Sequence, residues 1–196
     1  MPFDKRSTVF ISGSAYEYGS FGDLGKPFVK DLTRTLLKNN FRIISGFGLG
    51  IGSSVVEGAL DEVYTGKKES VTDHLLLYPF PIPSPSRDMA DIDDCYRKDM
   101  ISRAGVVIFV FGNKLHDISI KEADGMFKEF EIGRSNKARL IPVDASGYVS
   151  ERLWLEVLLR YDEYFDTREK FELYEQLGTP YTRPQRLIDL IIEIAK

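Results

Sequence analysis

The sequence has little of what several classes of protein require. One of its 196 residues is cysteine and two are histidine, which excludes an internal disulfide and a cysteine-based zinc cluster, and we expect no metal site. No run approaches the roughly 18 apolar residues that cross a membrane, and no apolar run of a secretory signal follows residues 1–6. We therefore expect a cytoplasmic protein without membrane contact.

Positive charge is also scarce. The 26 lysines and arginines are outnumbered by 30 aspartates and glutamates, for a formal net charge of −4. A dedicated nucleic-acid binder usually carries a basic excess, so we expect no nucleic-acid partner. With 43% hydrophobic residues, a chain of this length can bury one substantial core. We expect a single domain over residues 1–196.

Short apolar runs alternate with helical patterns along most of the chain. The run 105–111 is continuously apolar and rich in β-branched residues, which predicts a strand buried on both faces. Pro142 predicts an end or an edge for the run that contains it. The five expected strands are 8–12, 41–45, 74–78, 105–111 and 139–143. This alternation predicts an α/β fold, with a doubly wound, Rossmann-like parallel sheet and helices on both faces.

The helical patterns indicate which faces are buried. Phe28, Leu32 and Leu36 recur every four residues. Val56 and Leu60 repeat that spacing, and Val63 follows three residues further on. Apolar residues at such intervals are typical of an amphipathic helix.

After residue 143 the chain predicts only helices, at about 151–165, 168–177 and 184–195. One apolar stripe runs along the last of them: Leu187, Ile188, Ile191, Ile192 and Ala195. The stripe either covers the sheet or its edge, or forms part of a contact between copies of the chain. We expect self-association. The proline-rich segment 79–91 predicts a loop of extended backbone.

Two glycine-containing loops follow the first two expected strands, at 13–19 and 46–54. Ligands of open parallel sheets bind at the carboxyl ends of the strands. Four glycines at alternate positions before a helix offer unpaired N–H groups and the helix dipole to an anion. We favour phosphate contact over the alternative, a tight turn that needs glycine for packing alone. The candidate ligand-binding residues here are Ser12, Gly13, Ser14, Gly46, Phe47, Gly48, Leu49 and Gly50.

These loops match neither common nucleotide motif. No Gly-Lys-Ser/Thr follows the glycines, as a P-loop requires. The acidic residue expected about 20 positions on in a dinucleotide-binding fold is also missing. Ordinary NAD binding is therefore not predicted.

Three charged residues complete the expected ligand-binding set. Arg97 lies on the helix before the run 105–111, Lys114 follows that run, and Glu129 lies one turn into the next helix. Taken singly, Arg97 also fits a surface ion pair and Glu129 a solvated first-turn carboxylate. With the glycine loops, the three predict a pocket for the phosphate and ribose of a nucleotide.

Together these features resemble the SLOG superfamily, which includes the Smf/DprA proteins and the lonely-guy phosphoribohydrolases. Those hydrolases carry an Arg-Lys pair before a central strand that ends in Pro-Gly-Gly-x-Gly-Thr-x-x-Glu. Arg97-Lys98 stand in the matching place, and residues 125–129 match the second half. Lys-Glu-Ala at 121–123 replaces Pro-Gly-Gly, after additional residues, 113–121. A glutamate where the hydrolases cradle phosphate disfavours the same reaction.

The closer likeness is to the SLOG branch associated with Sir2 and TIR domains, and in particular to the C-terminal SLOG domain of Thoeris antiphage effectors. It rests on the segments 8–14 and 45–52 and on the positions of Arg97, Lys114 and Glu129. The resemblance implies a sensor that binds a cyclic ADP-ribose isomer and activates an N-terminal Sir2-like NAD-degrading domain of the same protein.

The resemblance also implies an oligomer, and a domain without catalytic residues or a cofactor of its own. The alternative is a lonely-guy-like hydrolase of nucleoside 5′-monophosphates. A third possibility is an oligomerisation domain with a vestigial pocket.

Overall fold

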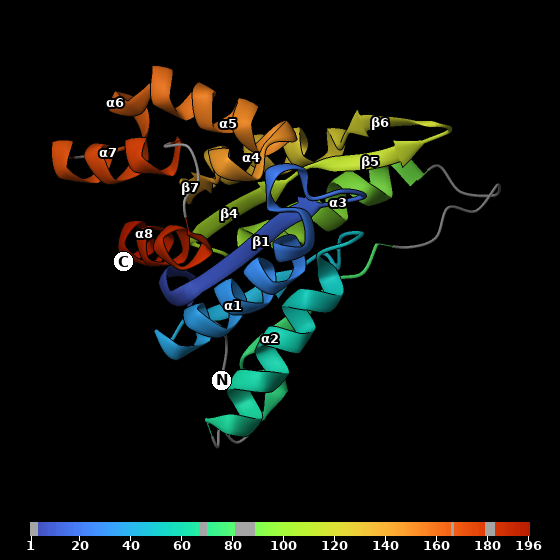
Figure 1. The fold of residues 1–196 in the computed structure, drawn as a ribbon, viewed down its shortest axis with the longest axis vertical. Coiled ribbons are helices and arrows are strands. Elements are labelled where there is room, and N and C mark those ends of the chain that lie inside the picture. The colour runs from blue at the N-terminus through green and yellow to red at the C-terminus, as the bar shows by residue number, and fades with distance from the viewer. Residues whose placement is uncertain (1–3, 67–69, 81–88, 166, 179–182) are drawn as a thin grey trace.

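The structure is a computed structural model that describes residues 4–66, 70–80, 89–165, 167–178 and 183–196. Its centre is a five-stranded sheet in the order β3-β2-β1-β4-β7, and every neighbouring pair of strands is parallel (Figure 1). The strands are β1 (Thr8–Ser14), β2 (Arg42–Ser45), β3 (Leu75–Leu77), β4 (Val106–Phe111) and β7 (Arg139–Pro142). The predicted fold class is confirmed.

The strand order locates the point where the sheet changes direction. From β1 the chain moves outward to β3, returns to β4 on the other side of β1, and then moves outward again to β7. In a doubly wound sheet, ligands bind at the carboxyl ends of the strands that flank such a reversal. The carboxyl ends of β1 and β4 are therefore the place to look for a site.

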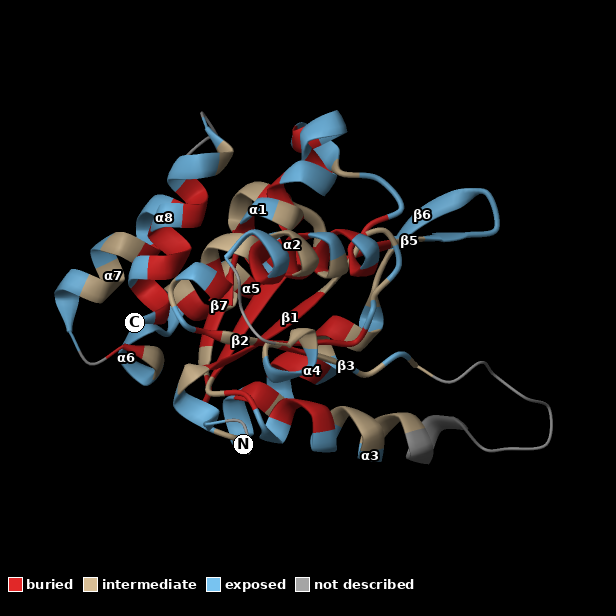
Figure 2. Cartoon of the chain, turned by 90° about the horizontal axis from the view of Figure 1, so that it is seen from below, coloured by how far each residue is buried: buried red, intermediate tan, exposed pale blue. Residues whose placement is uncertain are grey.

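Helices cover both faces of the sheet. α1 (Gly25–Lys38) and α2 (Gly52–Thr65) pack against each other on one face, and α3 (Met89–Ser102) and α4 (Asp124–Ser135) pack together on the other (Figures 1 and 2). Figure 2 shows the strands buried between these layers. In β4 every side chain is buried, as the apolar run predicted. Pro142 ends the edge strand β7, which is also confirmed.

The buried face of α1 follows the predicted spacing, whereas that of α2 follows it only at Val63. Val56 and Leu60 are only half-buried, while Val55 and Ala59 are inaccessible to solvent. The reason is Gly58, whose missing Cβ would lie 2.3 Å from the backbone oxygen of Lys30. Because the two helices approach so closely at this glycine, the face of α2 that contains Gly58, Val55 and Ala59 is the one packed against the core.

A β-hairpin that the sequence analysis did not predict leaves the end of β4. Its strands β5 (Asn113–His116) and β6 (Ser119–Glu122) are antiparallel and project from the sheet (Figures 1 and 2). The additional residues noted in the comparison with the hydrolase motif form this hairpin. It stands directly before α4, where those enzymes have Pro-Gly-Gly.

The remaining elements are mostly helical. After β7 come α5 (Tyr148–Leu159), α6 (Tyr161–Tyr164), α7 (Arg168–Glu175) and α8 (Pro184–Ala195). Short 3-10 helices occur at η1 (Lys5–Ser7), η2 (Gly19–Leu24), η3 (Val71–Asp73), η4 (Asp144–Ser146) and η5 (Gln176–Gly178). No helix in the described ranges combines the length and apolarity needed to span a bilayer. Most of the predicted proline-rich loop lies outside the described residues, but 89–91 begin α3.

The apolar stripe of α8 is used within the chain. Its five residues are all buried, and the helix packs against α1, α7 and β7. Burial of apolar surface against the sheet edge gives the stripe its energetic role. The interpretation of this stripe as a contact between copies of the chain is wrong, because the fold already covers it.

Candidate functional site

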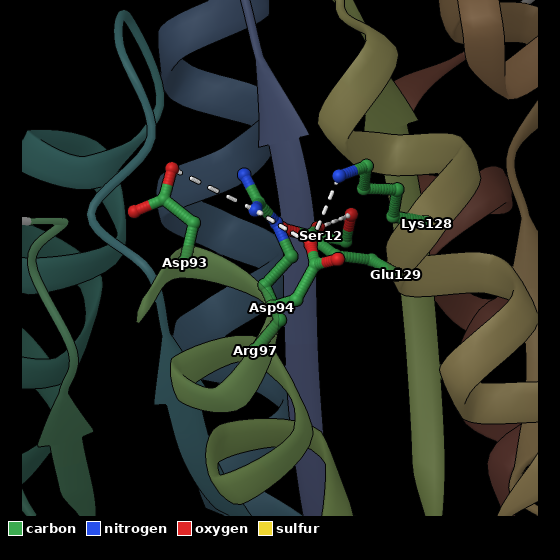
Figure 3. A network of polar contacts seen from close by, with 6 residues as sticks. All are labelled: Ser12, Asp93, Asp94, Arg97, Lys128 and Glu129. Carbon is green, nitrogen blue, oxygen red and sulfur yellow. Dashed lines mark hydrogen bonds and ion pairs between the residues drawn. The ribbon is translucent and has the colours of Figure 1, made fainter. Parts of the chain in front are cut away.

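Three of the predicted site residues meet where β1 and β4 end (Figure 3). The Ser12 hydroxyl, on β1, donates a hydrogen bond of 2.5 Å to Glu129 Oε2, on α4. Arg97, on α3, places its Nε 3.5 Å from Glu129 Oε1. Residues far apart in the sequence thus form one polar cluster at the reversal point of the sheet.

The Glu129 carboxyl is the buried centre of this cluster. Burial raises its pKa above the ordinary value, although the Ser12 hydrogen bond and the nearby charge of Arg97 act in the opposite direction. The alternative interpretation of Glu129 as a solvated first-turn carboxylate is therefore wrong. A carboxylate accepts hydrogen bonds, and its protonated form can also donate one; burial extends the pH range of the protonated form upward.

Arg97 is held from several sides but is not fully satisfied. Its side chain is 14% exposed, and Nη1 lies 3.9 Å from Asp93 and 3.8 Å from Asp94. The guanidinium lies over the ring of Phe80, with 4.6 Å from Cζ to the ring centroid. Arg97 Nε and Asp93 Oδ1 are buried and form no hydrogen bond with the described residues. Such groups are where a ligand gains the most by supplying a partner.

Lys98, the next residue along α3, lies on a different side of the helix. It is exposed and lines an apolar groove between α3 and α4, together with Phe127 and Ile132. Consecutive helical residues point about 100° apart, which explains why only the first of the Arg-Lys pair reaches Glu129.

The cluster contains more negative than positive side chains. Asp93, Asp94 and Glu129 face two cations, Arg97 and Lys128. Lys128 Nζ donates to Asp94 Oδ1 at 2.9 Å, and this hydrogen bond lowers the pKa of Asp94. An anionic ligand that pairs with Arg97 Nη1 therefore competes with the neighbouring aspartates.

The glycines after β1 and β2 are needed for packing. A Cβ on Gly48 would lie 2.0 Å from the Gly13 oxygen, and one on Gly50 would lie 1.8 Å from the Ala15 oxygen. Gly13 and Ser14, expected in a loop, continue β1 and pair with β4. The alternative interpretation, a tight turn that needs glycine for close approach, is thus correct for Gly48 and Gly50.

The same loop still offers donors at the edge of the cluster. Within the described residues, the amides of Gly48, Leu49 and Gly50 form no hydrogen bond. α2 follows directly, and no side chain caps its N-terminus. The packing role and the predicted anion contact are therefore compatible, because the glycines fix a loop whose amides remain unpaired.

Three other residues of this loop are Gly46, Phe47 and Leu49. Gly46 would place a Cβ 3.1 Å from the Phe80 ring, so this glycine adjoins the aromatic that covers Arg97. Phe47 and Leu49 are 46% and 64% exposed, and Phe47 has a φ of 54°, which is uncommon for a bulky residue. Exposed apolar side chains beside unpaired amides suit the base and phosphates of a nucleotide.

Lys114 is not brought into the cluster. It lies on β5, and its Nζ donates to Asp124 Oδ2 at 2.9 Å on an exposed surface. The hairpin is the reason, because it carries the residues after Asn113 outward from the end of β4. No contact in the described part of the chain joins Lys114 to Arg97 or Glu129.

Sequence reasoning missed the role of Asn113. This side chain is fully buried. Its Oδ1 accepts from the Tyr16 and Glu17 amides at 2.9 and 3.1 Å, and its Nδ2 donates to the Glu17 oxygen at 2.9 Å. The available signal was an amide side chain directly after a buried strand, where backbone groups need partners. Asn113 thereby ties the chain after β1 to the hairpin.

A second tie holds the same segment from α5. The Tyr148 hydroxyl donates to the Glu17 carboxylate. Burial, together with this partner, raises the pKa of Tyr148 to about 12. The backbone after β1 is therefore connected to both the hairpin and the C-terminal helices.

Comparison with known proteins identifies the family. A model of the Sir2- and TIR-associating SLOG family, STALD, matches residues 3–196. The chain belongs to this family. The STALD chain is 39% identical over 194 residues to the NAD(+) hydrolase ThsA of Cytobacillus dafuensis, covering 96% of the chain and 39% of that protein. It is 37% identical over 196 residues to ThsA of Bacillus cereus (strain MSX-D12), and this match covers 98% of the chain and 40% of that protein.

The chain thus spans about two fifths of the length of these relatives.

Two solved structures share the fold. The Northeast Structural Genomics Consortium target TM1055 has a TM-score of 0.52 at 16% identity, covering 84% of this chain and 88% of that one. The second is DNA processing protein A of Helicobacter pylori, described for its single-stranded DNA binding mode. Its TM-score is 0.53 at 15% sequence identity, and the match covers 97% of this chain and 82% of that one. At these identities the likeness shows the fold alone.

Proposed function

We propose that this STALD chain is a sensor domain that binds a cyclic ADP-ribose isomer. Binding activates a Sir2-like, NAD-degrading domain of the same protein in defence against phage. Membership of a Sir2- and TIR-associating family supports this role. Further support comes from relatives that are NAD(+) hydrolases more than twice as long as this chain.

The observation that carries the proposal is the buried cluster of Ser12, Arg97 and Glu129 at the carboxyl ends of β1 and β4. A cyclic ADP-ribose isomer presents a pyrophosphate and two riboses. Glu129 accepts hydrogen bonds from ribose hydroxyls, which is a common use of a carboxylate in nucleotide sites. Arg97 pairs with phosphate oxygens, for which the planar guanidinium is well suited.

The surrounding loops supply the rest of the site. The unpaired amides of residues 48–50 donate to the pyrophosphate, as backbone groups before a helix commonly do. Phe47, exposed at the rim, stacks on the adenine. In this role the domain needs no cofactor and no catalytic residue, because its output is a change of shape.

The charge of the cluster links ligand binding to a change of shape. Arg97 is held near Asp93 and Asp94 in the unbound chain. A pyrophosphate that pairs with Arg97 displaces these aspartates, which lie toward the N-terminal end of α3. The ligand thereby favours a different arrangement of that helix, and such differential binding is what shifts a conformational equilibrium.

A thermal-shift comparison with AMP, NAD, ADP-ribose and the cyclic ADP-ribose isomers tests the proposal. A ligand at 100 times its dissociation constant adds about 2.7 kcal/mol to stability, so a cyclic isomer should raise the melting temperature clearly. If no cyclic isomer does so, the proposed function is wrong.

Self-association is a further part of the proposal, and it rests on the family resemblance because α8 gives it no support. Sedimentation of the protein with and without a cyclic isomer tests it. Sedimentation as a monomer at all concentrations would remove it.

Hydrolysis of a nucleoside 5′-monophosphate is the second candidate, and the raised pKa of Glu129 beside Arg97 favours it. A buried carboxyl of this kind suits proton transfer. The hairpin disfavours this reaction, because it replaces the glycines that hold the phosphate in the hydrolases. Incubation with AMP, followed by chromatography for free adenine, separates the two functions. Turnover of about 1 per second or more, as in ordinary enzymes, would favour the hydrolase.

A further inference from the structure

A second pocket lies at the opposite end of the sheet from the Arg97 cluster. It has a volume of about 700 Å³ and is lined by residues from the amino ends of β4 and β7. The start of the described chain, the end of α6 and the end of α8 complete its walls. Five stretches of the sequence thus build one concave surface away from the proposed ligand.

The lining is strongly basic. Five of its side chains are cationic and one, Glu163, is acidic. The cationic residues are Lys5, Arg6, Lys137, Arg139 and Lys196. Because the whole chain has a formal net charge of −4, this accumulation runs against the overall balance. A concave surface with one sign of charge concentrates ligands of the other sign.

Contacts within the chain involve three of these cations, and the first is an exposed ion pair of Arg6 Nε with Asp4 Oδ1 at 4.0 Å. Arg139 Nη1 donates to the Ile194 oxygen at 2.9 Å, and Lys5 Nζ donates to the Asn136 oxygen at 3.4 Å. Both serve carbonyls at helix C-termini, where positive charge is stabilising. Lys137 and Lys196 form no side-chain hydrogen bond or ion pair with the described residues, and their charges are available to a partner.

The backbone conformation of Lys137 determines how its charge can be removed in a test. It follows the C-terminus of α4 with a φ of 54°. Glycine or asparagine is usual at such a position, because a larger side chain is strained there. A glycine at this position should relieve the strain, so the lysine charge can be removed without loss of stability.

We infer that this pocket docks an acidic segment of a protein partner. The C-termini of α4 and α8 border it and bring partial negative charge to its walls. A compact phosphate inside the pocket would meet that charge, whereas carboxylates spaced along a peptide reach the lysine and arginine tips. Leu140 and Phe165, which also line the pocket, offer apolar contact to the peptide between its charges.

Fluorescence anisotropy with a labelled hexaglutamate peptide tests this inference on the full chain at low ionic strength. Hexaglutamine is the matched neutral peptide, and inorganic triphosphate serves as a competitor. We expect hexaglutamate to bind and hexaglutamine not to bind. Added salt should weaken the complex, because exposed charges are screened.

Variants separate the pocket from charge in general. Lys137→Gly combined with Arg6→Ala removes two cations, and the glycine relieves the strained φ. We expect about tenfold weaker peptide binding without a lower melting temperature. The control, Lys26→Ala with Lys98→Ala, removes two exposed lysines elsewhere and should leave affinity within about twofold of the unmodified chain. Equal losses in both double variants, or tighter binding of triphosphate than of hexaglutamate, would overturn the inference.

Discussion

Replacing Glu129 by glutamine isolates the electrostatics of the candidate site without any ligand. Burial raises the pKa of Glu129 in the folded chain. A carboxyl whose pKa is raised on folding contributes its full stability below the pKa of the unfolded chain, about 4.3. That contribution is lost as the pH rises through the folded pKa. The fold therefore becomes less stable with increasing pH because of this one group.

The slope of the loss follows from the linkage of one proton. Between the unfolded and folded pKa values, the free energy of unfolding should fall by about 1.4 kcal/mol per pH unit through Glu129. Glutamine has no proton to lose, and its side-chain oxygen can still accept from Ser12. Asp93, Asp94 and the other titrating groups are common to both proteins, so the difference between them reports position 129.

Urea unfolding of the wild type and of Glu129→Gln from pH 4.5 to 8 measures this difference. We expect the free energy of unfolding of the variant, relative to that of the wild type, to increase as the pH rises. The increase should level off above the folded pKa. A flat difference would show that the carboxyl titrates normally. If the variant instead becomes less stable relative to the wild type as the pH rises, the ion pair with Arg97 outweighs burial, and the reasoning is refuted.

Two further substitutions test the framework around the site. Asn113→Ala removes three hydrogen bonds to Tyr16 and Glu17, so urea unfolding should show a loss of about 1.5–4 kcal/mol; a loss below 0.5 kcal/mol, roughly that of one weak bond, would contradict the role of this side chain. Gly48→Ala forces a Cβ to within 2.0 Å of the Gly13 oxygen and should cost about 1–3 kcal/mol or more. The exposed Ser53→Ala serves as control, and equal stability of the two variants would contradict close packing of the loop.

Much of the fold could be predicted because the strands are marked by strong local patterns. The run that forms β4 is apolar throughout, and Pro142 marks the end of β7, so both follow from residue chemistry alone. Strand order could not be derived in this way, because alternation of strands and helices does not say on which side of β1 the chain returns. The hairpin β5–β6 was not predicted, because Lys114 and His116 interrupt any apolar run that would have marked a strand.

Long-range packing explains the other differences. The inward face of α2 depends on how closely Gly58 approaches α1, which periodicity cannot show. The stripe of α8 looked the same whether it covered the sheet or another chain, and only its contacts with α1 and β7 decide the matter.

The candidate site was found in part for the same reasons. Arg97 and Glu129 were marked by their places beside a buried strand, and parallel topology brings those places together. Lys114 satisfied the same criterion, but the hairpin carries it away. Phe80 was expected only as one of several aromatics that stack on a base, and Asp93 only as one of several carboxylates around Arg97. The sequence could not select these two as the contacts of Arg97, because aromatic and acidic residues are common in that stretch.

Calorimetric titration with the cyclic ADP-ribose isomers, using the wild type, Arg97→Ala and Lys98→Ala, tests the central claim most directly. The wild type should bind one isomer. Loss of a charge-assisted phosphate contact of about 1.5–3 kcal/mol should weaken Arg97→Ala about 10- to 150-fold. Lys98→Ala should lose at most about fivefold, because its exposed charge is worth under about 1 kcal/mol. Absence of binding by the wild type, or a larger loss in Lys98→Ala than in Arg97→Ala, would contradict the account.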